Sequence, residues 1–226
     1  MSHFQFQTVS NIISGLGSIY ELKQLLQQQS YKKLLVVTDA GMIQQQLHLP
    51  IIEILETIQL DYVIYSSVQA DPPEHIVLDA VQFAKNEKAD IVLGFGGGSS
   101  LDVAKVIAVL AHPEQQHTLQ DLYGINNAKI PRLPLFLVPT TAGTGSEVTP
   151  ISIVTTGETT KTGIVSPVLF ADVAILDATF TQNLPAQITA ATGIDAMVHA
   201  IEAYTSKNKK ESLCRHVSQT GITLTQ

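Results

Sequence analysis

A glycine-rich turn is the part of this sequence whose residue types are best suited to bind a ligand. It follows an apolar run at residues 91–93, which does not alternate with polar residues and is therefore typical of a parallel strand covered on both faces. Glycines then occur at Gly94, Gly96, Gly97 and Gly98. Because glycine has no Cβ atom, the backbone of this turn can reach positive φ and come close to a ligand.

The residues after the turn predict the start of a helix. We expect Ser99 or Ser100 to cap this helix and Asp102 to lie in its first turn, with the helix running to about Ala111. Several backbone N–H groups would then point at one place, which suits a phosphate. The spacing lacks the third glycine of the usual dinucleotide fingerprint and the Gly-Lys-Ser/Thr of a Walker A loop. We therefore favour a pyrophosphate site of another lineage over the alternative, a tight turn whose glycines only satisfy steric demands.

A carboxylate follows another predicted strand, at residues 33–38. Asp39 could accept hydrogen bonds from ribose hydroxyls or contact adenine, and its charge would repel a 2′-phosphate, which favours NAD over NADP. The alternative is an Asx turn or a helix cap before Gly41. Ligands of parallel sheets lie at the carboxyl ends of the strands, so Asp39 and the glycine turn could line one crevice.

Hydroxyl side chains follow a further apolar run, at residues 135–138. Thr140, Thr141 and Thr144 could hydrogen-bond a cofactor phosphate or amide, although polar turns often have this composition. Thr140 and Thr141 would join the same crevice as the glycine turn. Lys161 lies in a loop rich in threonine and glycine, where it could neutralise a phosphate; the alternative is a solvated lysine.

A carboxylate and an imidazole are spaced as possible metal ligands near the end of the chain. Asp195 and His199 stand at i and i+4 of a predicted helix, so both side chains lie on one face. Oxygen and nitrogen ligands suit Fe²⁺, Mn²⁺ or Zn²⁺. The alternative is that Asp195 serves the start of the helix while His199 packs in the core. A metal site needs more than two protein ligands, and the other histidines show no paired spacing that supplies them.

The elements that would position these residues alternate between strand and helix, which indicates an α/β fold with a mainly parallel sheet. Strands are expected at 4–13, 33–38, 61–65, 91–93, 135–138, 151–155 and 173–176, with a helix pair across 42–59 and helices at 76–88 and 99–111. From about residue 181 the pattern suits helix only. We therefore predict a Rossmann-like dinucleotide-binding domain at 1–182 and the start of an all-α, metal-binding domain at 183–226.

Composition and charge narrow the class of protein. Hydrophobic residues make up 45% and charged residues 15%, which is typical of a globular chain. Thirteen basic and twenty acidic residues give a net charge of −7 without a basic stripe, so no nucleic-acid partner is expected. The single cysteine, Cys214, excludes an internal disulfide framework. No apolar run approaches a membrane span and no signal peptide is evident, so we expect a cytoplasmic protein without a membrane partner.

Three segments, in order and spacing, resemble the iron-containing (group III) alcohol dehydrogenases. They are residues 96–105 (GGGSSLDVAK), 139–149 (PTTAGTGSEVT) and 191–204 (ATGIDAMVHAIEAY), within a similarity that covers roughly residues 4–208. By resemblance, the positions that bind the cofactor are Asp39, Gly97, Gly98, Ser99, Asp102, Thr140, Thr141, Thr144, Thr149 and Lys161. Asp195 and His199 fall on two metal-ligand positions. Asp71 stands where many members carry Asn.

The resemblance implies an NAD(H)-dependent, metal-dependent alcohol dehydrogenase or aldehyde reductase. Its substrate would be a small alcohol or aldehyde, its metal Fe²⁺, with Zn²⁺ or Mn²⁺ as alternatives, and its assembly a homo-oligomer. In that family the metal is a Lewis acid that polarises the substrate oxygen while hydride passes to or from the nicotinamide. A metal-independent reductase is disfavoured because Asp195 and His199 are retained.

The last residues depart from this resemblance. Family members continue with further helices and two more metal-binding histidines, whereas residues 211–226 do not match the family. We expect a truncated or frameshifted product with an incomplete metal site. The competing hypothesis to an active dehydrogenase is therefore a catalytically inactive fragment that still binds the nucleotide.

Overall fold

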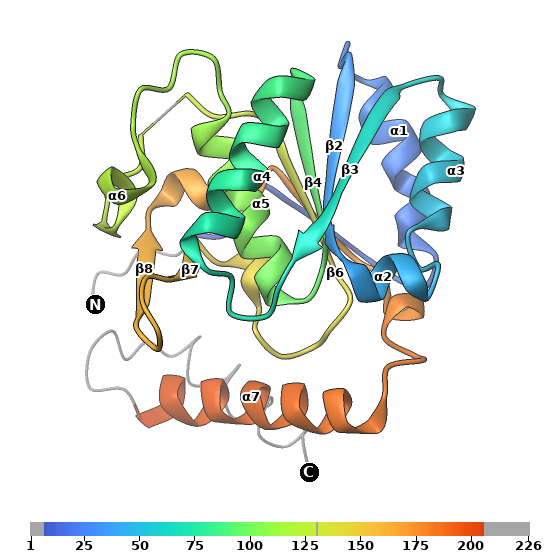
Figure 1. Cartoon of the computed structure of the whole chain (residues 1–226). Coiled ribbons are helices and arrows are strands. Elements are labelled where there is room, and N and C mark those ends of the chain that lie inside the picture. The colour runs from blue at the N-terminus through green and yellow to red at the C-terminus, as the bar shows by residue number, and fades with distance from the viewer. Residues whose placement is uncertain (1–6, 130, 206–226) are drawn as a thin grey trace, which may run out of the picture.

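The computed structural model describes residues 7–129 and 131–205 of the chain (Figure 1). The atypical segment at 211–226, with Cys214, and the first part of the strand expected at 4–13 lie outside the described residues. The strands are β1 (Asn11–Ser14), β2 (Lys33–Asp39), β3 (Asp61–Val68), β4 (Ile91–Gly96), β5 (Gly124–Ile125), β6 (Leu135–Pro139), β7 (Ile151–Thr155), β8 (Lys161–Val165) and β9 (Val173–Leu176). The α-helices are α1 (Leu22–Gln27), α2 (Ala40–Gln44), α3 (Leu49–Thr57), α4 (Glu74–Glu87), α5 (Gly98–Leu110), α6 (Leu119–Leu122) and α7 (Ala186–Thr205). Four 3₁₀ helices are η1 (Ser18–Glu21), η2 (Ser146–Val148), η3 (Pro167–Leu169) and η4 (Ala178–Phe180).

Six strands form one parallel sheet in the order β1-β9-β6-β4-β2-β3. Because all the pairings are parallel, the carboxyl ends of these strands meet at one edge. The fold is therefore the Rossmann-like α/β architecture with a mainly parallel sheet that the strand and helix pattern predicts.

Helices cover both faces of this sheet (Figure 1). In β2, Leu35 and Val37 belong to the hydrophobic core that contains α4 and α5, whereas Leu34 and Val36 belong to the core that contains α1 and α3. All four are fully buried. Successive side chains of a strand point to opposite faces, so an unbroken apolar strand can serve two cores at once.

A second, three-stranded sheet has the order β5-β8-β7. In it, β7 and β8 form an antiparallel pair, with Thr155 opposite Lys161. Lys161 therefore begins a strand, and its assignment to a loop was wrong. The threonine and glycine of the short strand β8 are typical of turns, which is why a loop was expected. Pairing with β7 nevertheless holds these residues in a strand.

The long helix α7 lies apart from the two cores. Figure 1 shows it crossing below the main sheet, on the side toward which β3 points. None of its residues is buried. Pro185 precedes it and its carbonyl accepts hydrogen bonds from the N–H groups of Ile188 and Thr189. The helix expected after residue 181 is thus present, and the domain boundary between 182 and 183 stays a prediction. Within the part of the chain that the structure describes, no helix is long and apolar enough to cross a membrane.

The buried carboxylate of Asp177 joins the start of the chain to the end of the main sheet. It accepts hydrogen bonds from the N–H groups of Gly17, Ile19 and Thr179, each at 3.0 Å, and from the Thr179 hydroxyl at 2.7 Å. Burial raises the pKa of Asp177, but these hydrogen bonds outweigh that effect and hold the pKa below its ordinary value.

Replacing Asp177 by Asn should lower the free energy of unfolding by about 2–3 kcal/mol, because an amide NH₂ would face N–H donors. The wild-type carboxylate has a lowered folded pKa, so its contribution is present above the unfolded pKa near 3.9 and is lost as the pH falls to the folded pKa. Urea unfolding from pH 7 to pH 2 should show this acid-dependent loss in wild type and less of it in Asp177→Asn. The exposed Asp61→Asn is the control, and an equal loss of stability in it would contradict the assignment.

Candidate functional site

The carboxyl ends of β3, β2 and β4 surround a cavity of roughly 390 Å³. Three short segments line it: 39–41 after β2, 68–70 after β3 and 97–100 after β4. The helices after β2 pack on one face of the sheet and α5 packs on the other, so the chain diverges on leaving these neighbouring strands. Such a divergence at the carboxyl edge is where open α/β sheets bind ligands.

Asp39 both caps α2 and lines the cavity. Its Oδ1 accepts hydrogen bonds from the N–H groups of Gly41 at 2.9 Å and Met42 at 3.2 Å. Its Oδ2 lies 3.5 Å from the Ser100 hydroxyl. The helix cap that the sequence left as an alternative is therefore present, and it uses mainly one of the two carboxylate oxygens. The cap orients the carboxylate toward the glycine turn, where the other oxygen can meet a ligand.

The glycine turn ends β4 and begins α5 without a side-chain cap. Gly96 has φ of 145°, a conformation that favours glycine. Gly97 is the N-cap residue, and no side chain of the described residues caps the first turn of α5. The expected cap by Ser99 or Ser100 was wrong because α5 begins at Gly98, so both serines lie inside its first turn. Its first N–H groups thus remain available at the edge of the cavity, an arrangement that suits an anion.

The segment after β6 lies against this turn. The Thr140 N–H donates to the Gly96 carbonyl at 3.0 Å, which continues the β4–β6 pairing past the strand ends. A Cβ atom added at Gly98 would lie 2.9 Å from Thr144, and one at Gly97 would lie 3.7 Å from Thr141. The sequence segments 96–99 and 140–144 are therefore side by side in the structure.

Thr140 is fully buried, and its hydroxyl has no hydrogen-bond partner among the described residues. A buried hydroxyl without a partner is unfavourable by roughly 1–3 kcal/mol, so it favours a bound group that supplies the partner. The Thr38 hydroxyl, near the end of β2, is also buried and also has no hydrogen-bond partner among the described residues. Thr38 is the last residue but one of β2 and Thr140 directly follows β6, and these two strands flank β4.

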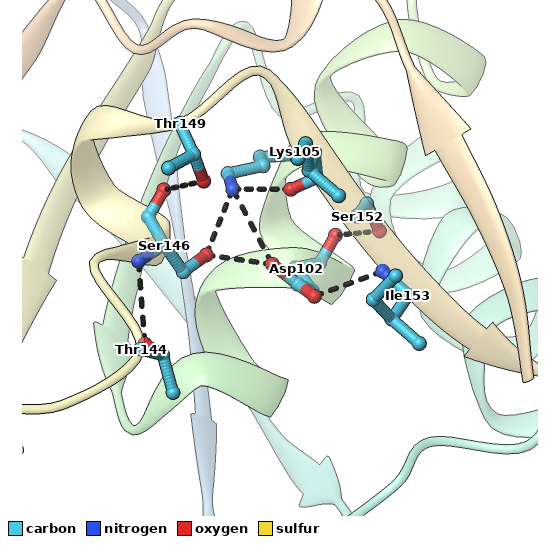
Figure 2. A network of polar contacts seen from close by, with 8 residues as sticks. Asp102, Lys105, Thr144, Ser146, Thr149, Ser152 and Ile153 are labelled. Carbon is cyan, nitrogen blue, oxygen red and sulfur yellow. Dashed lines mark hydrogen bonds and ion pairs between the residues drawn. The ribbon is translucent and has the colours of Figure 1, made fainter. Parts of the chain in front are cut away.

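Asp102 is not among the residues that line the cavity. It belongs to a network of polar contacts, which Figure 2 shows. It is the fifth residue of α5 rather than a first-turn residue, so that expectation was wrong. Its carboxylate accepts hydrogen bonds from the Ser146 hydroxyl at 2.6 Å and the Ile153 N–H at 2.9 Å. The Lys105 ammonium lies 3.3 Å from the same carboxylate. Asp102 thus links α5 to η2 and β7.

Two other predicted positions lie farther along the chain. Thr149 follows η2, and its hydroxyl donates to the Ser146 carbonyl at 3.3 Å. Lys161 reaches the loop after β3, where its ammonium pairs with Asp71 at 2.5 Å. Asp71 immediately follows the cavity-lining residue Ala70, so Lys161 is brought near the cavity. Both partners of this ion pair are largely exposed.

Asp195 and His199 share one face of α7, as their spacing predicts. Their nearest side-chain atoms, Oδ1 and Nε2, are 3.6 Å apart, and both side chains are exposed. The alternative of a core histidine is therefore wrong. Among residues 7–129 and 131–205, no group of three or more metal-ligand side chains is present. The helix lies close to the segment after β6, since a Cβ added at Gly143 would lie 2.6 Å from the Thr192 carbonyl.

Several site residues escaped the sequence reasoning. Gln69 and Ala70 line the cavity, but the strand before them was expected to end at residue 65 rather than at Val68. Lys105 is fully buried. A signal for it existed, since every other residue of the segment 103–110 is apolar.

A larger hollow, of roughly 1080 Å³, lies at the opposite edge of the sheet, near the amino ends of β1, β6 and β9. Its guanidinium group, Arg132, is already held by both carboxylate oxygens of Asp172 at 2.8 Å and by three carbonyl oxygens. The smaller cavity is the better candidate because unpaired donors and a carboxylate converge there.

The parallel sheet covered by helices, with a glycine turn at its carboxyl edge, defines a Rossmann-like α/β protein. Residues 10–178 match the family described as iron-containing alcohol dehydrogenase. The chain belongs to the iron-containing alcohol dehydrogenase family.

Relatives of known activity include a sulfoacetaldehyde reductase of Bilophila wadsworthia, 39% identical over 202 residues, which covers 89% of this chain and 52% of that protein. A long-chain-alcohol dehydrogenase of Geobacillus thermodenitrificans is 41% identical over 195 residues, covering 86% and 49%. The chain thus spans about half the length of the curated relatives it matches.

Solved structures agree with the fold. A 1,3-propanediol oxidoreductase has a TM-score of 0.87 at 30% identity, covering 100% of this chain and 61% of that one. The sulfoacetaldehyde reductase of Bifidobacterium kashiwanohense in complex with NAD⁺ has a TM-score of 0.89 at 26% identity, covering 100% and 59%.

Replacing Gly98 by Ala should displace Thr144 and lower the free energy of unfolding by about 1–3 kcal/mol, because the added methyl would overlap the threonine side chain. Thermal denaturation measures the change. Gly193→Ala in α7 is the matched control, since nothing lies within 4 Å of its added Cβ. Equal melting temperatures for the two variants would show that segments 96–99 and 140–144 are not packed together.

Proposed function

We propose that this chain binds NAD(H) as the nucleotide-binding part of a metal-dependent alcohol dehydrogenase or aldehyde reductase. The observation that carries the proposal is the uncapped amino end of α5, which opens beside Asp39 at the carboxyl edge of the sheet. Membership of the iron-containing alcohol dehydrogenase family and the NAD⁺ complex of a similar structure support it.

The residues present fit a dinucleotide. The first N–H groups of α5, at Gly98 and Ser99, would receive the pyrophosphate, whose charge the positive end of the helix favours. Gly97 leaves its surroundings open, since an added Cβ would meet only Thr141, at 3.7 Å. The hydroxyls of Thr140, Thr141, Thr144 and Thr149 and the Lys161 ammonium complete the proposed set. Asp102 contributes through its contacts with Lys105 and Ser146 rather than by touching the cofactor.

Asp39 would select the form of the cofactor. Its Oδ2, which takes no part in the α2 cap and has only a long contact with the Ser100 hydroxyl, can accept hydrogen bonds from ribose hydroxyls. The negative charge of the carboxylate disfavours the 2′-phosphate of NADP. The other oxygen remains on the α2 cap, so the carboxylate is oriented before the nucleotide binds.

Asp195 and His199 are proposed to hold a divalent metal, Fe²⁺ in the first place. A carboxylate oxygen and an imidazole nitrogen suit Fe²⁺, Zn²⁺ and Mn²⁺, and their common face on α7 lets both reach one ion. In alcohol dehydrogenation such an ion supplies Lewis-acid polarisation of the substrate oxygen. Complete coordination needs further ligands, which the described residues do not supply.

The substrate class we propose is a small alcohol or aldehyde, in keeping with the names of the relatives. A homo-oligomer in the cytoplasm is part of the same proposal, and the exposed apolar side chains of Ile194, Val198 and Ile201 on α7 support self-association. The second candidate function is nucleotide binding without turnover. It is favoured by the presence of only two metal-ligand residues at the proposed metal position among the described residues.

NADH should bind the wild-type chain, and a methyl group added at the glycine turn should weaken this binding. In a fluorescence titration, Gly97→Ala should weaken NADH binding by about tenfold or more, because the added Cβ obstructs the approach of the pyrophosphate. The melting temperature should stay close to that of wild type, since Thr141, at 3.7 Å, is the nearest described residue to the new methyl apart from the neighbours of Gly97 in the chain. Undiminished NADH affinity in Gly97→Ala would place the nucleotide elsewhere.

Turnover separates the two candidate functions. Alcohol oxidation is measured with NAD⁺ and added Fe²⁺ or Zn²⁺, with Asp195→Ala and His199→Ala as controls. Metal-stimulated turnover that both controls abolish supports the dehydrogenase. NADH binding without such turnover supports the nucleotide-binding fragment.

Replacing Asp39 by Ser should shift the cofactor preference toward NADPH. Serine keeps an oxygen that can cap α2 but removes the negative charge. We expect the ratio of the NADPH and NADH dissociation constants to move at least about tenfold in favour of NADPH. Both constants come from the same fluorescence titration, and an unchanged ratio would rule out Asp39 as the residue that discriminates.

A further inference from the structure

Lys105 is a fully buried lysine on α5, outside the residues that line the cavity. Its ammonium donates to the Ser146 hydroxyl at 2.8 Å, to the Ile151 carbonyl at 2.5 Å and to the Asp102 carboxylate at 3.3 Å (Figure 2). These three acceptors use all the donors of an ammonium group. They come from η2, from the first residue of β7 and from α5 itself.

The network continues from Lys105 to the glycine turn. The Ser146 hydroxyl accepts from Lys105 and donates to Asp102, so both its roles are engaged. The Ser146 N–H donates to the Thr144 hydroxyl at 3.2 Å. The Thr144 side chain in turn lies against Gly98, where an added Cβ would be 2.9 Å away. A continuous series of contacts thus leads from the buried ammonium to the start of α5.

Stability alone does not explain a buried ammonium, because its desolvation is unfavourable. A protein with an apolar side chain of similar volume at the same position is often at least as stable. Burial lowers the pKa of Lys105, while the carboxylates of Asp102 and Glu147 act against that change. Directional hydrogen bonds to a charge hold their partners in one arrangement, which apolar contacts do not. The groups held here are the segment after β6 and the start of β7.

We propose that Lys105 is a positioning residue of the cofactor site. Its ammonium holds Ser146 and the start of β7 against α5, and so places the segment 140–149 opposite Gly97 and Gly98. The inference rests on the proposed function, which places Thr140, Thr141, Thr144 and Thr149 of this segment in the cofactor site. Because β6 and β2 lie on opposite sides of β4, the segment lies across the glycine turn from Asp39, the proposed ribose contact, and we assign it to the pyrophosphate and nicotinamide side of NAD(H). Lys105 itself does not touch the cofactor.

Ser146→Ala tests the proposal, because it removes the link from Lys105 to the segment and leaves the Lys105–Asp102 pair. Ser152→Ala is the matched control. Ser152 is also buried, and its hydroxyl also donates to α5, to the Asp102 carbonyl at 3.0 Å. Among the described residues, this hydroxyl makes no hydrogen bond to Lys105 or to segment 140–149. The dissociation constants of NADH and of AMP are measured for each variant. AMP carries the adenosine side and one phosphate, whereas NADH adds the second phosphate and the nicotinamide half.

Ser146→Ala should weaken NADH by about tenfold and AMP by less than about twofold, because misplacement of the segment affects the part of the ligand that AMP lacks. Ser152→Ala should change neither constant by more than about twofold. Lys105→Met should reproduce the NADH effect if it folds, and failure of that variant to fold leaves the Ser146 comparison decisive. Equal weakening of NADH and AMP in Ser146→Ala would indicate a purely structural role and overturn the proposal. So would an NADH affinity within about twofold of wild type.

Hydrogen exchange on the ligand-free chain separates this proposal from the proposed function. If wild type binds neither nucleotide, the proposed function fails, and the holding role of Lys105 is judged by exchange alone. Ser146→Ala should then speed amide exchange in residues 144–149 relative to Ser152→Ala, without changing exchange in β2. Unchanged exchange in 144–149, or a uniform increase over the chain, would overturn the holding role.

Discussion

The burial of both faces of the parallel sheet is the constraint on which the rest of this structure depends. The central strands are apolar at successive positions, as Leu34 to Val37 show, because each face is covered by its own layer of helices. Polar side chains of the central strands β2, β4 and β6 therefore lie near the strand ends. Since all six strands run in parallel, those ends gather the distant residues Asp39, Gly97 and Thr140 at one edge. The cavity at that edge is a consequence of the topology.

Hydrogen-bond donors without a partner among the described residues make this edge of the sheet suitable for binding a polar ligand. The start of α5 has no side-chain cap, and the Thr140 hydroxyl has no partner among the described residues. By contrast, the side chains of Asp102 and Lys105 are hydrogen-bonded to partners, in a network that spans α5, η2 and β7. The uncapped start of α5 lines the cavity, whereas Asp102 and Lys105 lie outside the lining. This contrast distinguishes the surface that would meet a ligand from the residues that support it.

Prediction from sequence was good where the signal is local. The apolar strands, the glycine turn, the helix pair after β2 and the Asp195/His199 spacing each depend on residues within one or two turns of chain. Prediction was less accurate where a structure depends on pairing with a strand that is distant in the sequence. The end of β3 was expected three residues early because Ser66 and Ser67 read as a turn, yet pairing with β2 extends the strand to Val68. The strand β8 was missed because Lys161 to Val165 is strand-forming mainly through its pairing with β7.

The sequence by itself determined the fold class, the glycine turn at a strand end and the family, since apolar periodicity and motif spacing are properties of consecutive residues. Only the tertiary structure decided what individual side chains do. It moved Asp102 from the helix start to a buried network, showed that Asp39 caps α2 while facing the cavity, and paired Lys161 with Asp71 across 90 residues of sequence. These outcomes rest on contacts between segments that are far apart in the chain. Residue type limits what a side chain can bind, but the fold decides which partners come within reach.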